Sequence, residues 1–188
     1  LAQGKNVSIP KEEDYKFEVV TVGEAISDLA GYKVEDEVDN ATEIPYGEKD
    51  KLSEYALLMR KGSEGINNHI VPKTRETAQM RFSALSEGEN FHKLDDKLKA
   101  NYADPDRTQN SIYLRLDSNQ PSGTVVNVRK SMWVHPTTDR AISVREAARL
   151  QSFPDRFVFE GTKDSQYQQV GNAVPPLMAH GIARKVLE

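Results

Sequence analysis

The residues best suited to chemistry in this chain are amides and cations, not nucleophiles. None of the 188 residues is a cysteine, which excludes a thiolate nucleophile, a disulfide and thiolate metal ligands within the sequence. The four histidines lack metal-ligand spacing, so we expect no metal site and no catalytic group here. The segment Gly171-Asn172-Ala173-Val174 offers an amide that both donates and accepts hydrogen bonds. On the residues alone, a turn before a helix starting at Pro175-Pro176 is favoured over a ligand-binding loop.

A second polar group lies where the charge is most positive. Residues 107–156 contain eight Lys or Arg against four Asp or Glu, whereas residues 11–64 contain seven against fifteen, and the whole chain carries −4. Asn and Gln can read adenine, and Arg and Lys can read guanine, in the DNA major groove. Either this region is ordinary charged surface, or it is a DNA face that includes Asn119, Gln120, Asn127, Arg129, Lys130 and Trp133.

Two capping boxes mark helices that would position these groups. Thr21 with Glu24, and Ser143 with Glu146, have the spacing at which side chain and backbone cap each other. They predict helices over 22–29 and from 144 to about 151. Further helices are predicted over 53–60, over 74–85 and from the prolines at 175–176 to the C-terminus, while 1–20 and 31–51 are predicted to be irregular.

The middle of the chain has the alternation of a sheet. Residues 112–116 and 124–128 alternate apolar and polar side chains, and 131–135 is predicted to be a third extended piece. The fold class is therefore predicted to be α+β, with a small, twisted, mainly antiparallel sheet and flanking helices.

Arg145 and Arg149 are four residues apart on the helix after Ser143, so they share a face. One alternative is that an Arg reaches a phosphate. In that alternative the helix also organises the predicted sheet. We favour a structural role for Arg145, Glu146 and Arg149, as part of a capped helix whose arginines pair with nearby carboxylates.

Two long segments resemble a known family. HPTTDRAISVREAARLQSFPDRFVF (135–159) and YQQVGNAVPPLMAHGIA (167–183) resemble the ninth and tenth conserved blocks of the bacterial cytosine-5 DNA methyltransferases, in the same order. Weaker similarity is found in TVGEAISDL (21–29), YLRL (113–116) and PSGTVVN (121–127). The family's Gly-rich cofactor block and Pro-Cys nucleophile loop are absent from the sequence. The resemblance therefore implies the C-terminal portion of an enzyme that methylates carbon 5 of cytosine in double-stranded DNA.

The resemblance also implies roles for particular residues. Asn172, Ala173 and Val174 would contact S-adenosylmethionine, with Gly171 as a structural residue. Thr124 and Val125 would lie near the flipped base, although an ordinary strand is the alternative on the pattern alone. Residues 1–139 would form the target-recognition region, and 140–188 would return to a missing Rossmann-like catalytic domain.

Several expectations concern partners. We expect double-stranded DNA and the missing N-terminal catalytic domain or subunit as partners, a cytoplasmic location without a membrane span, and a possible dimer through the C-terminal helix. The chain alone is expected to be inactive. It would be a fragment of a single-chain enzyme, the smaller subunit of a split methyltransferase, or a non-enzymatic DNA-binding module. Its target sequence, and a role in restriction-modification or as an orphan methylase, stay open.

Overall fold

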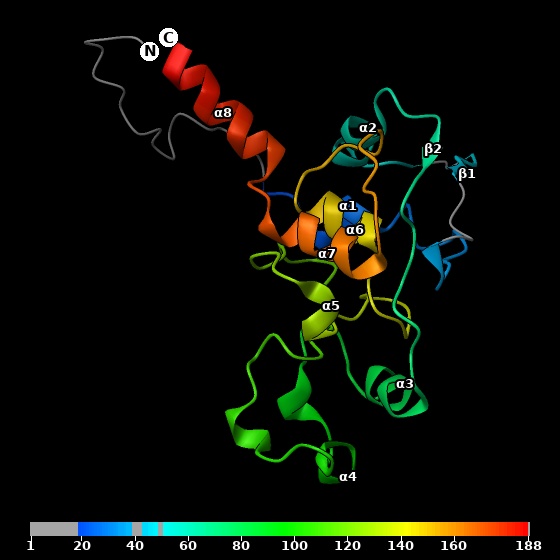
Figure 1. Ribbon diagram of the computed structural model, residues 1–188, viewed down its shortest axis with the longest axis vertical. Coiled ribbons are helices and arrows are strands. Elements are labelled where there is room, and N and C mark those ends of the chain that lie inside the picture. The colour runs from blue at the N-terminus through cyan, green and yellow to red at the C-terminus, as the bar shows by residue number, and fades with distance from the viewer. Residues whose placement is uncertain (1–18, 39–42, 49–50, 188) are drawn as a thin grey trace.

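The computed structural model describes residues 19–38, 43–48 and 51–187, and its elements are mostly short helices (Figure 1). Two 3-10 turns, Phe91–Lys93 and Pro105–Arg107, accompany them. None of the described helices is long and apolar enough to cross a membrane. The helices in chain order are α1 (Val22–Ile26), α2 (Glu54–Arg60), α3 (Glu76–Ser83), α4 (Asp96–Lys99), α5 (Val128–Ser131), α6 (Val144–Leu150), α7 (Lys163–Asn172) and α8 (Pro176–Leu187).

Both predicted capping boxes are present. The Thr21 hydroxyl accepts from the Glu24 amide at 3.2 Å, and the Glu24 carboxylate accepts from the Thr21 amide at 2.8 Å. The matching distances between Ser143 and Glu146 are 3.1 and 2.7 Å. These local bonds satisfy the free amides of the first turn, so α1 and α6 begin where the sequence predicts. Helix α1 ends at Ile26 and continues as turns, earlier than predicted.

The predicted three-stranded sheet is wrong in its place and extent. Within the described residues, the strands are β1 (Ile44–Pro45) and β2 (Gly65–Ile66), which form an antiparallel pair. β1 lies inside the loop predicted for residues 31–51, and β2 lies after it. Residues 112–135 contribute only isolated bridges, Arg115 to Val134 and Val134 to Ala141. Tyr113 and Met132 have φ values of 52° and 56°. A left-handed residue turns the chain locally, and the pairing between 112–116 and 131–135 stays limited to the Arg115–Val134 bridge.

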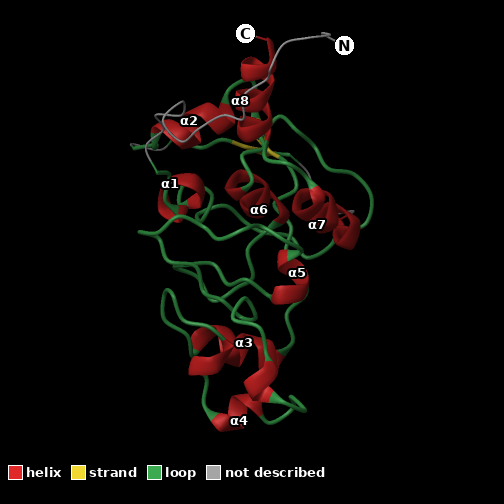
Figure 2. Ribbon diagram, turned by 90° about the vertical axis from the view of Figure 1, so that its left-hand side faces the viewer, coloured by secondary structure: helices red, strands yellow, loops and turns green. Residues whose placement is uncertain are grey.

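The central core is formed by α1, α6 and α7, which pack together in both ribbon views (Figures 1 and 2). Helix α7, which the sequence reading missed, contributes Tyr167 and Val170, while α1 contributes Ile26. This core contains residues from both sides of the predicted division at residue 139.

A second apolar cluster lies around α3, at the lower end of the molecule in Figure 1. Phe82, Phe91 and Tyr113 are its largest side chains, and the Phe82 and Tyr113 rings lie 5.8 Å apart. The Arg115 guanidinium ties this cluster to the following loop, since it donates to the Phe82 carbonyl at 2.6 Å and to the His135 carbonyl at 2.9 Å.

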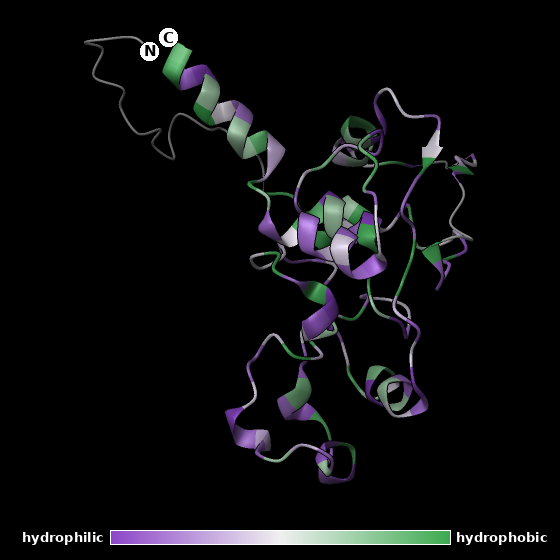
Figure 3. Ribbon diagram, in the orientation of Figure 1, coloured by the Kyte–Doolittle hydropathy of each residue, from purple (hydrophilic) through white to green (hydrophobic). Residues whose placement is uncertain are grey.

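The predicted C-terminal helix is present as α8, which projects from one end of the molecule (Figure 1). None of its described residues is buried. Met178, Ile182 and Val186 are 58%, 39% and 51% exposed, and the hydropathy colouring in Figure 3 shows green apolar bands along the helix. Irregular structure is predicted for residues 1–20, and residues 1–18 of that segment lie outside the described residues.

Candidate functional site

Arg145 of α6 is wholly buried and bonds to backbone carbonyls. Its Nε donates to Asn67 at 2.8 Å, and its Nη atoms donate to Pro154 at 3.1 Å and Phe157 at 2.5 Å. Burial lowers the pKa of this guanidinium to about 10, so it stays charged at neutral pH. One side chain thus fixes two loops against α6.

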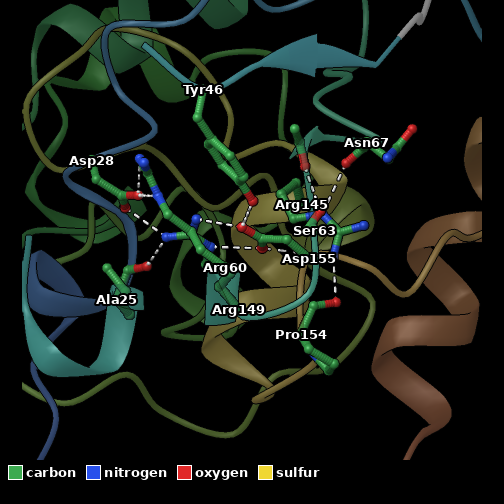
Figure 4. Close-up of polar contacts among 12 residues, drawn as sticks. Ala25, Asp28, Tyr46, Arg60, Ser63, Asn67, Arg145, Arg149, Pro154 and Asp155 are labelled. Carbon is green, nitrogen blue, oxygen red and sulfur yellow. Dashed lines mark hydrogen bonds and ion pairs between the residues drawn. The ribbon is translucent and has the colours of Figure 1, made fainter. Parts of the chain in front are cut away.

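Arg149, one turn further along, is the centre of a buried ionic network (Figure 4). It donates to both carboxylate oxygens of Asp155, at 2.9 and 2.6 Å, and to Asp28 at 2.6 Å. Arg60 also pairs with Asp28 at 2.7 Å, and the Tyr46 hydroxyl donates to Asp155 at 2.5 Å. Burial alone would raise the pKa of Asp155, but the Arg149 hydrogen bonds outweigh it and lower that pKa.

Glu146 of α6 anchors a second polar cluster. It is fully buried, and Arg140 donates to its two oxygens at 2.7 and 2.6 Å. Burial would raise the pKa of Glu146, but these bonds outweigh it and hold the pKa at about 2. His135 lies 3.6 Å from the same carboxylate, beyond hydrogen-bonding distance. Because Arg140 already matches the negative charge, burial dominates at His135 and lowers its pKa to about 4.

Hydrogen bonds to its backbone hold the segment between α7 and α8, and the half-buried Ala173 side chain packs against the central core. The Gln151 amide donates to the carbonyl of Ala173 at 2.9 Å, and the Ser152 hydroxyl accepts from the Leu177 amide at 3.1 Å. Asn172 and Val174 are exposed. The predicted turn at Gly171-Asn172 is wrong, because both residues close α7. The predicted helix start at the two prolines is confirmed, since α8 begins at Pro176.

Gly171 brings two predicted site segments together. A Cβ added there would lie 2.7 Å from the Val126 carbonyl carbon and 3.0 Å from the Asn127 amide nitrogen. Only a glycine therefore allows the end of α7 to lie directly on the segment after Thr124. The predicted cofactor loop and the predicted DNA segment are in backbone contact.

The predicted DNA residues differ in accessibility. Thr124 and Lys130 are exposed, Arg129 pairs with Asp164 of α7, and the Asn127 side chain caps α5 by accepting from the Lys130 amide at 3.4 Å. Val125 is 3% exposed and belongs to the core.

Trp133 is 2% exposed and packs in the central core, so its expected place on a DNA face is corrected. An indole is the largest apolar side chain available, and the short elements around it bury it. Part of the basic excess is also internal, since Arg115, Arg145 and Arg149 are 4%, 0% and 0% exposed. The positive character of residues 107–156 is therefore only partly a surface property.

Sequence reasoning missed the partners of the buried arginines. Asp28, Tyr46 and Arg60 are distant from α6 in sequence, and nothing in their local pattern indicates the contact. Asp155 is six residues after Arg149, beyond a helical turn, and reaches it because α6 ends at Leu150 and the chain then turns at Ser152, whose φ is 62°.

The family described as C-5 cytosine-specific DNA methylase matches residues 2–188, which is nearly the entire sequence. The capped helix α6, in which Arg145, Glu146 and Arg149 are buried, and the end of α7 at Gly171-Asn172 both lie within that match. This chain belongs to the C-5 cytosine-specific DNA methylase family.

Curated relatives agree with this assignment. The type II methyltransferase M.DdeI of Desulfomicrobium norvegicum is 30% identical, over 97% of this chain and 46% of its own length. The type II methyltransferase M.AquIB of a Picosynechococcus strain is 46% identical over 93 residues, which are 44% of this chain and 67% of that relative. A crystal structure of a candidate DNA modification methyltransferase from an E. coli prophage has 25% identity and a TM-score of 0.67, covering 100% of this chain and 51% of that one. The chain thus spans about half of the M.DdeI relative and of the solved structure.

Proposed function

We propose that this chain is the C-terminal portion of a DNA (cytosine-5-)-methyltransferase, which transfers a methyl group from S-adenosylmethionine to carbon 5 of cytosine in a specific double-stranded sequence. Family membership supports the chemistry. The observation that carries the proposal is helix α8, whose apolar stripe is uncovered within the described residues and directly follows the Asn172 loop. An amphipathic helix of this kind is stable when another domain covers it.

The residues of the α7–α8 loop fit the cofactor. An exposed amide at Asn172 can donate to and accept from the amino-acid part of S-adenosylmethionine, and Val174, 60% exposed, offers an apolar contact. When bound, the cofactor supplies an electrophilic methyl group. The task of this chain is to hold one side of the cofactor, and the Gln151 and Ser152 bonds keep the loop rigid for it.

Target recognition is the second task that we assign to the chain. Thr124, Arg129 and Lys130 stand beside the proposed cofactor loop and carry groups that bond phosphates or base edges. The side-chain oxygen of Asn127 accepts the capping bond from the Lys130 amide, and its side-chain nitrogen takes no part in that bond.

The reactive centre belongs to the other portion. Methylation needs a thiolate that adds to carbon 6 of cytosine, so that carbon 5 becomes the nucleophile, and an acid near ring nitrogen 3. This chain has no cysteine. Whether the two portions are one polypeptide or two is open, and the M.AquIB relative is itself short, since 93 matched residues are 67% of it.

Complementation tests the proposal. The chain is mixed with a catalytic half that carries the Gly-rich and Pro-Cys blocks, and radioactive methyl transfer from S-adenosylmethionine to duplex DNA is measured, with the modified cytosines mapped by bisulfite sequencing. We expect no turnover with either part alone and site-specific turnover with both. Turnover by the chain alone, or a stable complex of both parts without any turnover, would overturn the proposal.

A further inference from the structure

We propose that a cationic cleft between α3 and α5 binds a phosphodiester group of the nucleic-acid backbone. This inference rests on the proposed function and adds a contact that the sequence did not suggest. The cleft has a volume of about 450 Å³ and lies between the start of α3 and the region of α5. Its cationic lining residues are Lys73, Arg75, Arg81 and Arg129.

Arg81 provides a buried positive charge without a carboxylate partner. It is 4% exposed, and it donates to the Leu98 carbonyl at 2.8 Å, to the Tyr113 hydroxyl at 2.9 Å and to the Asn101 side-chain oxygen. These acceptors are all neutral, and within the described part of the chain no carboxylate lies within ion-pair distance of Arg81.

The other deeply buried arginines differ from Arg81 in this respect. Arg115 pairs with Asp139 at 2.5 Å, and Arg149 pairs with Asp28 and Asp155 at 2.6 Å. Arg145, which bonds to backbone carbonyls, also lies within ion-pair distance of Asp155, at 3.9 Å. A buried charge is costly unless a counter-charge offsets it. An anion that enters the cleft would supply the counter-charge that the fold itself gives to the other arginines.

Lys73 and Arg75 add mobile charge at the rim of the cleft. Both side chains are exposed, and neither forms an ion pair with another residue that the structure describes. No carboxylate lines the cleft. Asp164 pairs with Arg129 but does not line the cleft. Because the Asp164 side chain is 61% exposed, a phosphate can compete with it for Arg129.

The position of the cleft favours a phosphodiester over a free anion. Arg129 lies in α5, which Asn127 caps and which follows the exposed Thr124 segment. Thr124 and Lys130 therefore lie close to the cleft along the chain. A DNA strand that contacts them can continue past α5 and place a phosphate against Arg129 in the cleft. Multiple Lys and Arg contacts to the backbone fix the register of a protein on DNA without reading sequence.

A salt titration with matched variants tests the cleft. Binding of a fluorescent duplex of arbitrary sequence is measured at several salt concentrations for the natural chain, for Lys73→Ala/Arg75→Ala and for Lys93→Ala/Lys97→Ala. The second pair is exposed, belongs to the same end of the molecule, does not line the cleft and changes the net charge equally. We expect only the cleft variant to bind several-fold more weakly, with a salt slope smaller by about 2 because each lost phosphate contact removes about 0.9.

Chemical protection identifies the ligand. Acetylation of Lys73 should slow when duplex DNA is added, while that of Lys93 should not. Equal salt slopes for the cleft variant and the natural chain would overturn the inference, even if complementation succeeds and the proposed function stands. Protection of Lys73 by inorganic phosphate but not by duplex would overturn it too. If the natural chain neither binds duplex DNA nor restores methylation with the catalytic half, this result would instead count against the proposed function.

Discussion

At the scale of single residues, Gly171 joins the two surfaces that the proposed enzyme needs. The atoms that a Cβ would meet, at 2.7 to 3.0 Å, belong to the backbone of Val126 and Asn127 and cannot rotate away. Gly171→Ala must therefore separate α7 from this segment. We expect a loss of about 1–3 kcal/mol in the free energy of unfolding, measured by urea denaturation, as for other overpacked sites.

The matched control is Gly123→Ala, since nothing lies within 4 Å of a Cβ there. It should change the unfolding free energy by less than about 0.5 kcal/mol. Equal effects of the two substitutions would mean that the contact of Gly171 with Val126 contributes nothing.

His135 predicts how stability depends on pH. Its pKa is about 4 in the folded chain against an ordinary value of 6.5, so between these values the unfolded chain binds a proton that the folded chain does not. The free energy of unfolding should therefore fall as the pH falls below 6.5, by roughly 2 kcal/mol between pH 6.5 and 5 from this residue. Urea titrations at a series of pH values measure it.

His135→Gln removes this titration and should flatten the decline. Some slope should remain, because burial also lowers the pKa of His69. A variant whose decline is as steep as that of the natural chain would show that His135 does not titrate in this window.

At the scale of elements, local signals predicted the helices better than the strands. A capping box needs only residues i and i+3, so the starts of α1 and α6 could be read from the sequence. Alternation at 112–116 and 124–128 predicted strands that do not form. A strand needs a partner. The left-handed Tyr113 interrupts the first segment, and the second runs into α5 at Val128.

Helix α8 gives a prediction that separates folding from assembly. Ile182 and Val186 are exposed, so Ile182→Glu/Val186→Glu should change the unfolding free energy of the isolated chain by less than about 0.5 kcal/mol. The same variant should abolish complementation with the catalytic half, since two charges would face its apolar surface.

Arg184→Glu is the control on the same helix, because it changes the net charge equally and Arg184 is not part of the apolar stripe. It should leave complementation largely intact. If the double variant complements as well as the natural chain, the stripe is not the docking surface. Size-exclusion chromatography of the isolated chain tests the predicted dimer.

At the scale of the whole molecule, the Arg149 network joins distant segments into one unit. The Arg149 guanidinium pairs with Asp28, which follows α1, and with Asp155, which follows α6, while Arg60 at the end of α2 pairs with the same Asp28 (Figure 4). Arg149→Met leaves the buried Asp155 without its close counter-charge, whereas Asp28 keeps its pair with Arg60. We expect a cost of about 3–5 kcal/mol, measured by chemical denaturation.

The control is Arg156→Met, which removes an exposed arginine that donates only to the Lys61 carbonyl, at 2.8 Å. It should cost less than about 1 kcal/mol. Similar costs for both substitutions would show that the buried network is worth no more than a surface hydrogen bond.

The sequence by itself determined what depends on neighbours along the chain: the two capping boxes, the amphipathic C-terminal helix and the motifs at 135–159 and 167–183 by which the family is identified. The tertiary structure decided which polar residues are buried. It placed Trp133 and Arg145 inside, gave Arg81 no carboxylate partner among the residues that the structure describes, and set Gly171 against Val126. The physical reason is that a cap is a hydrogen bond across three residues, whereas burial and charge pairing depend on segments that meet only when the chain has folded.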